Sequence, residues 1–242
     1  MLNNNIAVNV SNLSRHFGAF KAVDNISFTV QRGEIFGFLG ANGAGKTTTI
    51  RMLCGLLLPS SGQAQVAGLD IYKESEKIKQ RIGYMSQKFS LYEDLTIKEN
   101  IEFYGGIYGL SRKAIQVKIK ELLDQIELWE HADALTSALP LGWKQRLALS
   151  CALLHDPEIV FLDEPTSGVD PVSRRNFWLL IYKLAEAGKT IFVTTHYMDE
   201  AEYCHNLSIM KDGKIVELAK PAVLKEKYKV NNMQDVFLAA VK

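Results

Sequence analysis

The spacing of hydrophobic residues changes along this 242-residue chain. Short apolar or alternating runs predict strands at 6–10, 26–30, 34–39, 63–67 and 81–85. A helix is predicted at 47–57, and Pro59-Ser60-Ser61-Gly62 predicts a turn after it. From 97 to about 126 the pattern becomes helical, because apolar residues recur along one helical face at Ile115, Ile119, Leu122, Leu123 and Ile126.

Alternation of strands and helices resumes after residue 157. Strands are predicted at 159–162, 190–194, 207–210 and 214–218, and helices at 171–187, 221–228 and 233–241. Lys211-Asp212-Gly213 predicts a hairpin turn between the last two strands. The helical stretch at 97–126 therefore interrupts an α/β pattern, which indicates an inserted helical lobe.

Composition narrows the class of protein only modestly. Hydrophobic residues make up 47% and charged residues 23%, and the net charge of +1 gives no electrostatic reason to expect a nucleic acid partner. Three widely spaced cysteines, Cys54, Cys151 and Cys204, form no metal-binding pattern and favour a reducing compartment. With no signal-peptide pattern and no apolar run near the ~18 residues of a membrane span, we expect a cytoplasmic protein.

A phosphate-binding loop is the most specific feature of the sequence. The segment Gly40-Ala41-Asn42-Gly43-Ala44-Gly45-Lys46-Thr47 fits G-x-x-x-x-G-K-[ST], between a predicted strand and a predicted helix. Its backbone N–H groups, and those that follow at Thr48, suit nucleotide phosphates, while Lys46 adds positive charge and Thr47 offers a hydroxyl to Mg²⁺. The alternative is a glycine-rich turn. We expect ATP and Mg²⁺ as cofactors.

Two acidic residues follow the buried strand predicted at 159–162. Asp163 suits a Mg²⁺ ligand, and Glu164 suits a general base that takes a proton from attacking water. We expect this strand beside the strand of the P-loop in a parallel sheet, because ligands bind at the carboxyl edge of such sheets. The alternative is an acidic cap on a helix after Pro165.

Taken together, the motifs resemble one family, the ATPase subunits of ABC transporters, over essentially the whole chain. The shared elements occur in the family's order: Phe17, the P-loop, Gln87, a signature region at 139–145, the acidic strand, Asp170 and His196. The resemblance implies one α/β domain over 1–242 with a P-loop NTPase core and a mostly parallel sheet. It further implies an N-terminal antiparallel β subdomain and an inserted helical subdomain. The core and β subdomain are expected roughly at 1–87 and 157–228, the helical subdomain at 88–156 and a short C-terminal helix at 232–241.

The resemblance also implies residue roles. Phe17 should stack on adenine, unless it is a core aromatic at a strand end. Gln87 should contact Mg²⁺ or the lytic water, and His196 should bond the γ-phosphate and orient Glu164. Asp170 should couple two sites across a dimer interface. The alternatives are a plain loop amide for Gln87 and helix caps for His196 and Asp170.

The signature region departs from the family pattern LSGGQ. This chain has Leu139, Pro140, Leu141, Gly142 and Trp143, so the serine hydroxyl that faces the partner's ATP in the family is lost. A lost hydrogen bond to a charged group costs roughly 1.5–3 kcal/mol. We expect an altered but usable cap. The alternative is that the chain is one half of a protein with two unequal ATPase domains.

Segments such as LDEPTSGVDP and TTHYMDEAE look like those of the ABC-2 export branch. The resemblance implies an ATP-driven homodimer, or pairing with a second ATPase domain. It also implies an integral-membrane permease partner at the inner face of the membrane, for export of drugs, lipids, polysaccharides or ions. Phe89, Tyr92, Phe103, Tyr104 and Tyr108 are expected to form its docking site, and the alternative is that these side chains fill the core of the helical lobe. Alternatives are a soluble ABC ATPase of translation or DNA maintenance, and a binding module without turnover.

Overall fold

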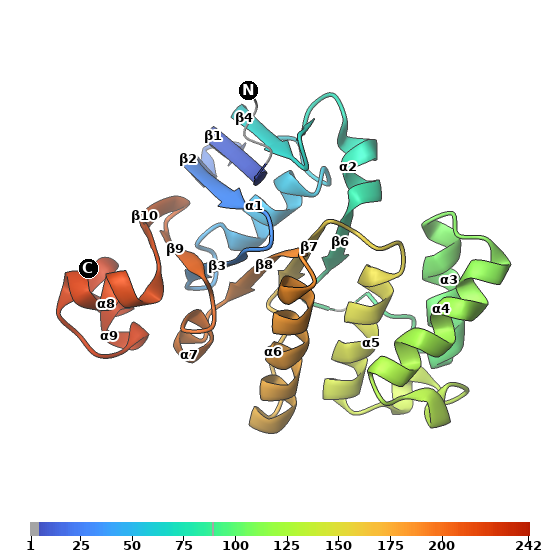
Figure 1. Ribbon diagram of the computed structural model, residues 1–242. Helices are drawn as coiled ribbons and strands as arrows, with labels where there is room; N and C mark the ends of the chain where they lie inside the picture. Colours follow the sequence, from blue (N-terminus) through green and yellow to red (C-terminus); the bar gives the residue numbers. More distant parts are fainter. Residues whose placement is uncertain (1–4, 89) are drawn as a thin grey trace.

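The computed structural model describes residues 5–88 and 90–242, and two β-sheets organise them (Figure 1). Phe89, one of the aromatic residues of the predicted docking site, lies outside the described residues. The larger sheet has six strands in the order β10-β9-β3-β8-β7-β6. Its strands are β3 (Ile35–Gly40), β6 (Ile82–Met85), β7 (Ile159–Asp163), β8 (Thr190–Thr195), β9 (Asn206–Lys211) and β10 (Lys214–Ala219).

The larger sheet is mostly parallel, as predicted. Only β10 runs antiparallel to its neighbour, through the predicted hairpin, whose Asp212 and Gly213 have φ of 49° and 77°. The strand of the acidic pair, β7, was expected beside the P-loop strand β3, and this is wrong: β8 lies between them. A parallel sheet presents all its carboxyl ends at one edge, so Asp163 still faces the P-loop from one strand further away.

The smaller sheet is antiparallel, with strand order β2-β1-β4-β5. It consists of β1 (Ile6–Phe17), β2 (Phe20–Gln31), β4 (Ser61–Val66) and β5 (Leu69–Asp70). The first two strands are longer than the apolar runs at 6–10 and 26–30 suggested. Register shifts, together with positive φ values at Asn12 and Asn25, interrupt the alternation of buried residues, so the sequence pattern hid the full length of both strands.

The helical stretch predicted from 97 to about 126 is two helices, α3 (Ile97–Ile107) and α4 (Arg112–Gln125). Gly109 takes a left-handed φ of 73° between them, and the Ser111 side chain caps α4 by accepting from Ala114 N. A Cβ on Gly105 would approach Ile115 to 2.7 Å, so this glycine lets α3 pack closely on α4. These local signals end one helix and begin the next.

The remaining helices cover the larger sheet and the chain end. The P-loop helix α1 ends at Leu53, earlier than the predicted Leu57, because Gly55 takes a left-handed φ of 67° just after it. That helix, α1, spans Lys46–Leu53, and the others are α2 (Ser75–Arg81), α5 (Leu141–Leu153), α6 (Pro171–Glu186), α7 (Met198–Ala201), α8 (Pro221–Tyr228) and α9 (Met233–Ala240), with short 3₁₀ turns at Trp129–His131 and Thr136–Ala138.

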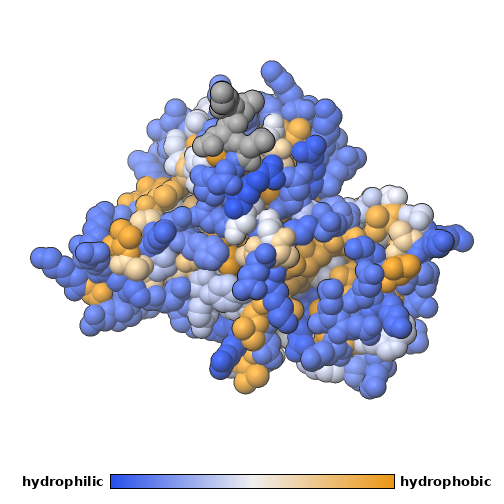
Figure 2. Space-filling model, in the orientation of Figure 1, coloured by the Kyte–Doolittle hydropathy of each residue, from blue (hydrophilic) through white to orange (hydrophobic). Residues whose placement is uncertain are grey.

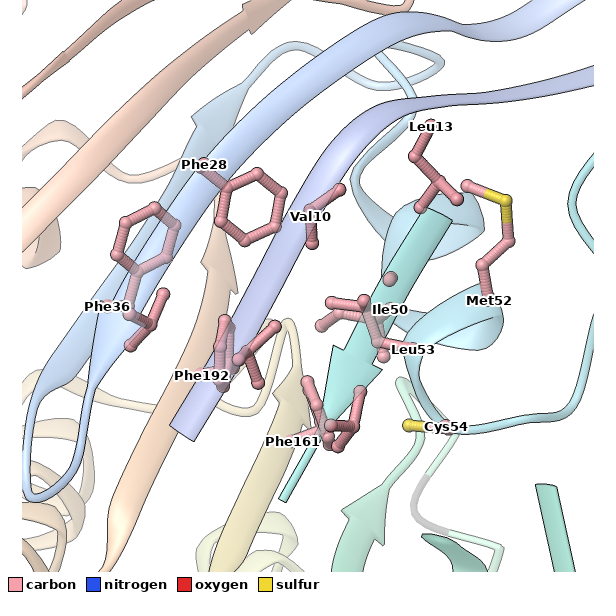
Figure 3. Close-up of a cluster of buried hydrophobic side chains, with 14 of the residues drawn as sticks. Val10, Leu13, Phe28, Phe36, Ile50, Met52, Leu53, Cys54, Phe161 and Phe192 are labelled. Atoms are coloured by element: carbon pink, nitrogen blue, oxygen red, sulfur yellow. The ribbon is translucent and has the colours of Figure 1, made fainter. Parts of the chain in front are cut away.

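Three clusters of buried apolar residues hold the fold. The first joins the smaller sheet, α1 and one face of the larger sheet, where Phe28, Phe36, Phe161 and Phe192 gather (Figure 3). The second packs α6 and part of α5 on the opposite face, and the third lies within residues 97–154, the helical lobe. Because both faces of the larger sheet are covered, every residue of β3 is buried. The predicted subdomain boundaries stay a prediction.

The surface shows no large apolar region on the face drawn in Figure 2, where hydrophilic residues dominate and hydrophobic residues form small groups. Within the described residues, none of the helices combines the length and apolar character of a membrane span. All three cysteines are free and buried.

Candidate nucleotide site

The P-loop joins β3 to α1 and depends on glycine at its last turn. Gly45 is the N-cap residue of α1 and adopts φ 104°, a conformation that side chains disfavour. A Cβ there would also lie 2.5 Å from Ala22 O on β2. The smaller sheet therefore contacts the loop so closely that only glycine fits at position 45. The amides at this helix start point away from the helix, where they suit an anion.

Lys46 lies inside the loop with only 4% of its surface exposed. Its ammonium donates to Gly40 O at 2.8 Å and to Ala41 O at 3.2 Å, and lies 3.4 Å from Glu164 Oε1. Burial lowers the pKa of Lys46, while the Glu164 and Asp163 carboxylates oppose that shift. The buried cation is therefore already compensated by carbonyl and carboxylate oxygens of the chain.

The acidic pair sits at the carboxyl end of β7. Asp163 Oδ1 accepts from Thr194 Oγ1 at 2.7 Å and from Thr47 Oγ1 at 3.0 Å. Burial raises the pKa of Asp163, and those two hydroxyl bonds act against the rise. The contact between Thr47 and Asp163 joins the P-loop helix to β7 across the intervening strand β8.

Glu164 is the point on which the predicted site residues converge. It is 7% exposed and holds φ 48°, a strained backbone for a non-glycine residue. Gln87 Nε2 donates to its Oε2 at 3.0 Å. His196 Nδ1 lies 3.2 Å from the same oxygen without completing a hydrogen bond among the described groups. His196 caps no helix, because Tyr197 is the N-cap residue of α7 and no side chain caps that helix.

Phe17 lies at the end of the β1–β2 hairpin and is 48% exposed, so the alternative of a core aromatic is wrong. It lines a cavity of about 370 Å³ with Phe20, Ala22, Gln87, Glu164 and P-loop residues from Asn42 to Thr48. The cavity thus has an aromatic end at the hairpin and a phosphate end at the loop. Phe20 and Ala22 were missed in the sequence, although Phe17-Gly18-Ala19-Phe20 carries a second aromatic close to the first.

The signature segment does not line this cavity, although its Leu141 lines a neighbouring cavity together with Gln87. Pro140 is the N-cap residue of α5 and offers no capping side chain, and Leu141 is 42% exposed. Gly142 packs on α6, where a Cβ would approach Ser173 Oγ to 2.7 Å. Asp170 caps α6 by accepting from Val172 N at 3.0 Å and from Ser173 N at 2.9 Å, which is the alternative role considered above. Its role at a dimer interface stays a prediction.

The predicted Mg²⁺ ligands fit the ion by their chemistry. Thr47, Gln87 and Asp163 offer hydroxyl, amide and carboxylate oxygens, the donors that Mg²⁺ prefers, and few of them, since Mg²⁺ keeps several waters beside bound phosphates. Thr47 and Asp163 are in direct contact, at 3.0 Å. The described residues contain no cluster of three or more His, Cys, Asp and Glu side chains that would suit an all-protein metal cage.

Thr194 is a further site residue that sequence reasoning missed. Its hydroxyl donates to Asp163 and accepts from Glu164 N at 2.8 Å, so one side chain of β8 fixes both acidic residues. The signal was a threonine pair at the end of an otherwise apolar strand, since such hydroxyls need buried partners.

Comparison with known proteins agrees with this geometry. The family model described as ABC transporter matches residues 23–167. The chain belongs to the ABC transporter ATP-binding family. It is 52% identical over 218 residues to the probable multidrug ABC transporter ATP-binding protein YbhF of Escherichia coli, covering 90% of this chain and 38% of that protein. It therefore spans well under half of YbhF.

A second relative is the Nod factor export ATP-binding protein I of Burkholderia lata, 40% identical over 90% of this chain and 72% of that protein. Among solved structures, an ATP-binding subunit of an ABC transporter superposes with a TM-score of 0.87 at 26% identity, covering 98% and 100% of the two chains. A dimeric ATP-binding cassette with ADP and phosphate bound reaches 0.79 at 26% identity, covering 88% and 98%. The predicted family and α/β P-loop NTPase fold are confirmed.

Proposed function

We propose that this ABC ATP-binding chain hydrolyses ATP and drives export through a membrane permease. The observation that carries the proposal is the convergence of Lys46, Gln87 and His196 on the buried carboxylate of Glu164, beside a P-loop. A binding module without turnover has no use for a strained acidic residue held between three such groups.

In the proposed reaction, adenine stacks on Phe17 and the phosphates lie along the P-loop against Lys46. Glu164 accepts a proton from the attacking water, while Gln87 and His196 fix its orientation. Mg²⁺, held by Thr47, Asp163 and Gln87, would neutralise charge on the phosphates. His196 reaches toward the terminal phosphate from the end of β8.

Export is the transport class that the relatives favour, because their names describe multidrug transport and Nod factor export. The alternative of a soluble ATPase in translation or DNA maintenance receives no support from them. We therefore propose that the chain works in the cytoplasm as a peripheral subunit at the inner face of the membrane.

The permease is proposed to dock where the helical lobe meets the core. A cavity of about 240 Å³ lies there, with Leu56 and Tyr84 on the core side and Tyr104 and Tyr108 on the lobe side. Leu56 is 51% exposed. Beside the cavity, Tyr92 and Phe103 form an edge-to-face aromatic pair with centroids 4.6 Å apart. Such aromatic surfaces are typical anchors for a short partner helix.

Docking is tested by Tyr92→Asp, with Trp129→Asp as the matched control. Both aromatics are surface-exposed, at 45% and 47%, and neither lines the cavity itself, but only Tyr92 belongs to the aromatic pair beside it. Tyr92→Asp should abolish association with the co-expressed permease and leave nucleotide binding unchanged, whereas Trp129→Asp should preserve both. If Tyr92→Asp folds, binds ATP and still co-purifies with the permease, the docking site lies elsewhere.

Turnover itself is tested by phosphate release from the purified chain with Mg²⁺·ATP, and again after chelation of the metal. The proposal predicts release that depends on Mg²⁺ and saturates with ATP. If the chain binds ATP but releases no phosphate, even with the permease or a second ATPase domain present, it is a binding module without turnover.

A further inference from the structure

Glu200 is a fully buried carboxyl group that the proposed reaction does not use. It lies on α7, four residues after His196, and has 0% of its surface exposed. Burial of a carboxyl group is costly unless both of its oxygens find hydrogen-bond donors. The hydrogen-bond partners of Glu200 therefore indicate which parts of the chain this residue holds in position.

Both carboxyl oxygens accept from threonine hydroxyls, one at the end of β8 and one in the loop after β7. Thr195, the last residue of β8, donates to Oε2 at 2.6 Å. Thr166, two residues after Glu164, donates to Oε1. Arg174 Nε of α6 lies 3.6 Å from the same Oε1 and supplies positive charge. One side chain thus connects the segment that carries Glu164 to the segment that carries His196.

The chain on both sides of His196 belongs to this network. Thr195 precedes it, and the Thr195 hydroxyl also accepts from Tyr197 N at 2.9 Å. The Arg174 guanidinium lies 4.2 Å from the centre of the Tyr197 ring. His196 itself is 33% exposed at the side chain, so its backbone is held from both sides while its ring reaches into the site.

We propose that Glu200 is a positioning residue for ATP hydrolysis, which sets the distance between Glu164 and His196 by holding Thr166 and Thr195 together. The inference rests on the proposed function. Two groups that act on one reacting phosphate tolerate little displacement, and a shift of about 1 Å costs about 100-fold in rate. Loss of a bond to Glu200 should therefore slow the chemical step without weakening ATP binding.

Two variants remove these bonds, and each has a matched control at the opposite end of the same sheet. Glu200→Gln replaces one acceptor oxygen by an NH₂ group that cannot accept from a hydroxyl. Its control is Glu34→Gln, because Glu34 is 8% exposed and accepts from Gln31 N at 2.8 Å, just before β3. Thr195→Val is matched by Thr190→Val, since Thr190 begins β8 and accepts from Gly33 N at 3.1 Å.

The measurements are the unfolding temperature, the Kd for Mg²⁺·ATP, and kcat and KM of phosphate release. Glu200→Gln and Thr195→Val should lower kcat about 10- to 100-fold, with the Kd and KM within about twofold of wild type. The controls should lose similar thermal stability and keep kcat within about twofold. In a His196→Ala background, Glu200→Gln should cause no further loss of kcat, because Glu200 acts by positioning His196.

Equal loss of kcat in variants and controls of equal stability would overturn the inference, as would an unchanged kcat or full additivity with His196→Ala. If Glu200→Gln does not fold, Thr195→Val against Thr190→Val carries the same comparison. A wild-type chain that binds ATP without hydrolysis overturns the proposed function itself, and this inference with it. An active wild type with unaffected variants overturns the inference alone.

Discussion

At the scale of single residues, the backbone at Gly45 links the smaller sheet to the phosphate site. A side chain there meets two penalties, a left-handed φ of 104° and a 2.5 Å approach to Ala22 O. The conformational penalty alone is about 1–2 kcal/mol. The clash must in addition move either the loop or β2.

We therefore expect Gly45→Ala to lower both the unfolding temperature and the affinity for ATP. Gly43→Ala is a useful comparison, because Gly43 also has a positive φ of 83° but a Cβ there would meet no atom within 4 Å. Gly43→Ala should lose less stability than Gly45→Ala, as read from thermal unfolding. Equal losses would show that the contact with Ala22 does not matter.

Lys46 supports a second prediction at this scale. Its ammonium is buried among carbonyl and carboxylate oxygens, where charge-assisted bonds to phosphate are strong. Lys46→Ala should therefore weaken ATP binding by about 1.5–3 kcal/mol, measured by titration calorimetry. Affinity within error of wild type would contradict the role of Lys46 in phosphate binding.

At the scale of elements, α5 begins after Pro140, where the LSGGQ pattern that this segment resembles has serine. Pro140 is its N-cap residue, and no side chain satisfies the first amides of the helix. Serine at this position is expected to stabilise the helix by about 1 kcal/mol and to restore a donor toward the partner's nucleotide.

Pro140→Ser should accordingly raise both the unfolding temperature and the yield of ATP-dependent dimer, and Pro140→Ala should raise neither. Analytical ultracentrifugation of the two variants with ATP separates these effects. A serine variant that is more stable but dimerises no better would mean that this segment does not face the partner's ATP.

The same element scale shows where sequence patterns were sufficient and where they were not. Motifs with an unusual chemistry at fixed spacing, such as the P-loop and the Asp163–Glu164 pair, predicted residues that the structure brings together: Glu164 lines one cavity with the P-loop, and Asp163 contacts Thr47. The predicted helix ends were wrong where a single glycine, Gly109 or Gly55, ends the helix. The predicted strand lengths were wrong where irregularities at Asn12 and Asn25 interrupt the alternation of buried residues. Thr194 was missed because its role depends on which strands are neighbours, which no local pattern specifies.

At the scale of the whole molecule, the cavity beside the P-loop is formed without the signature segment. Within one chain, residues 139–143 do not line the cavity that holds Lys46 and Glu164. We expect a second ATPase domain to complete the site, with its signature segment over the phosphates, in a homodimer or in a pair with a different domain.

We predict that Glu164→Gln dimerises in ATP and dissociates in ADP, because the γ-phosphate would bridge the two halves and ADP lacks this group. Light scattering at increasing protein concentration measures this. A strictly monomeric species in ATP, with the permease present as well, would contradict the head-to-tail arrangement.

The proposed function depends on Glu164 as the general base of ATP hydrolysis, and one comparison of variants tests this role directly. ATP affinity and phosphate release are measured side by side for wild type, Glu164→Gln and the control Glu158→Gln. Glu158 precedes β7, while Glu164 follows it. The Glu158 side chain is 40% exposed and paired with Arg32. We predict that Glu164→Gln binds ATP like wild type and releases almost no phosphate, while Glu158→Gln does both normally. A Glu164→Gln variant that keeps most of its activity would show that Glu164 is not the general base.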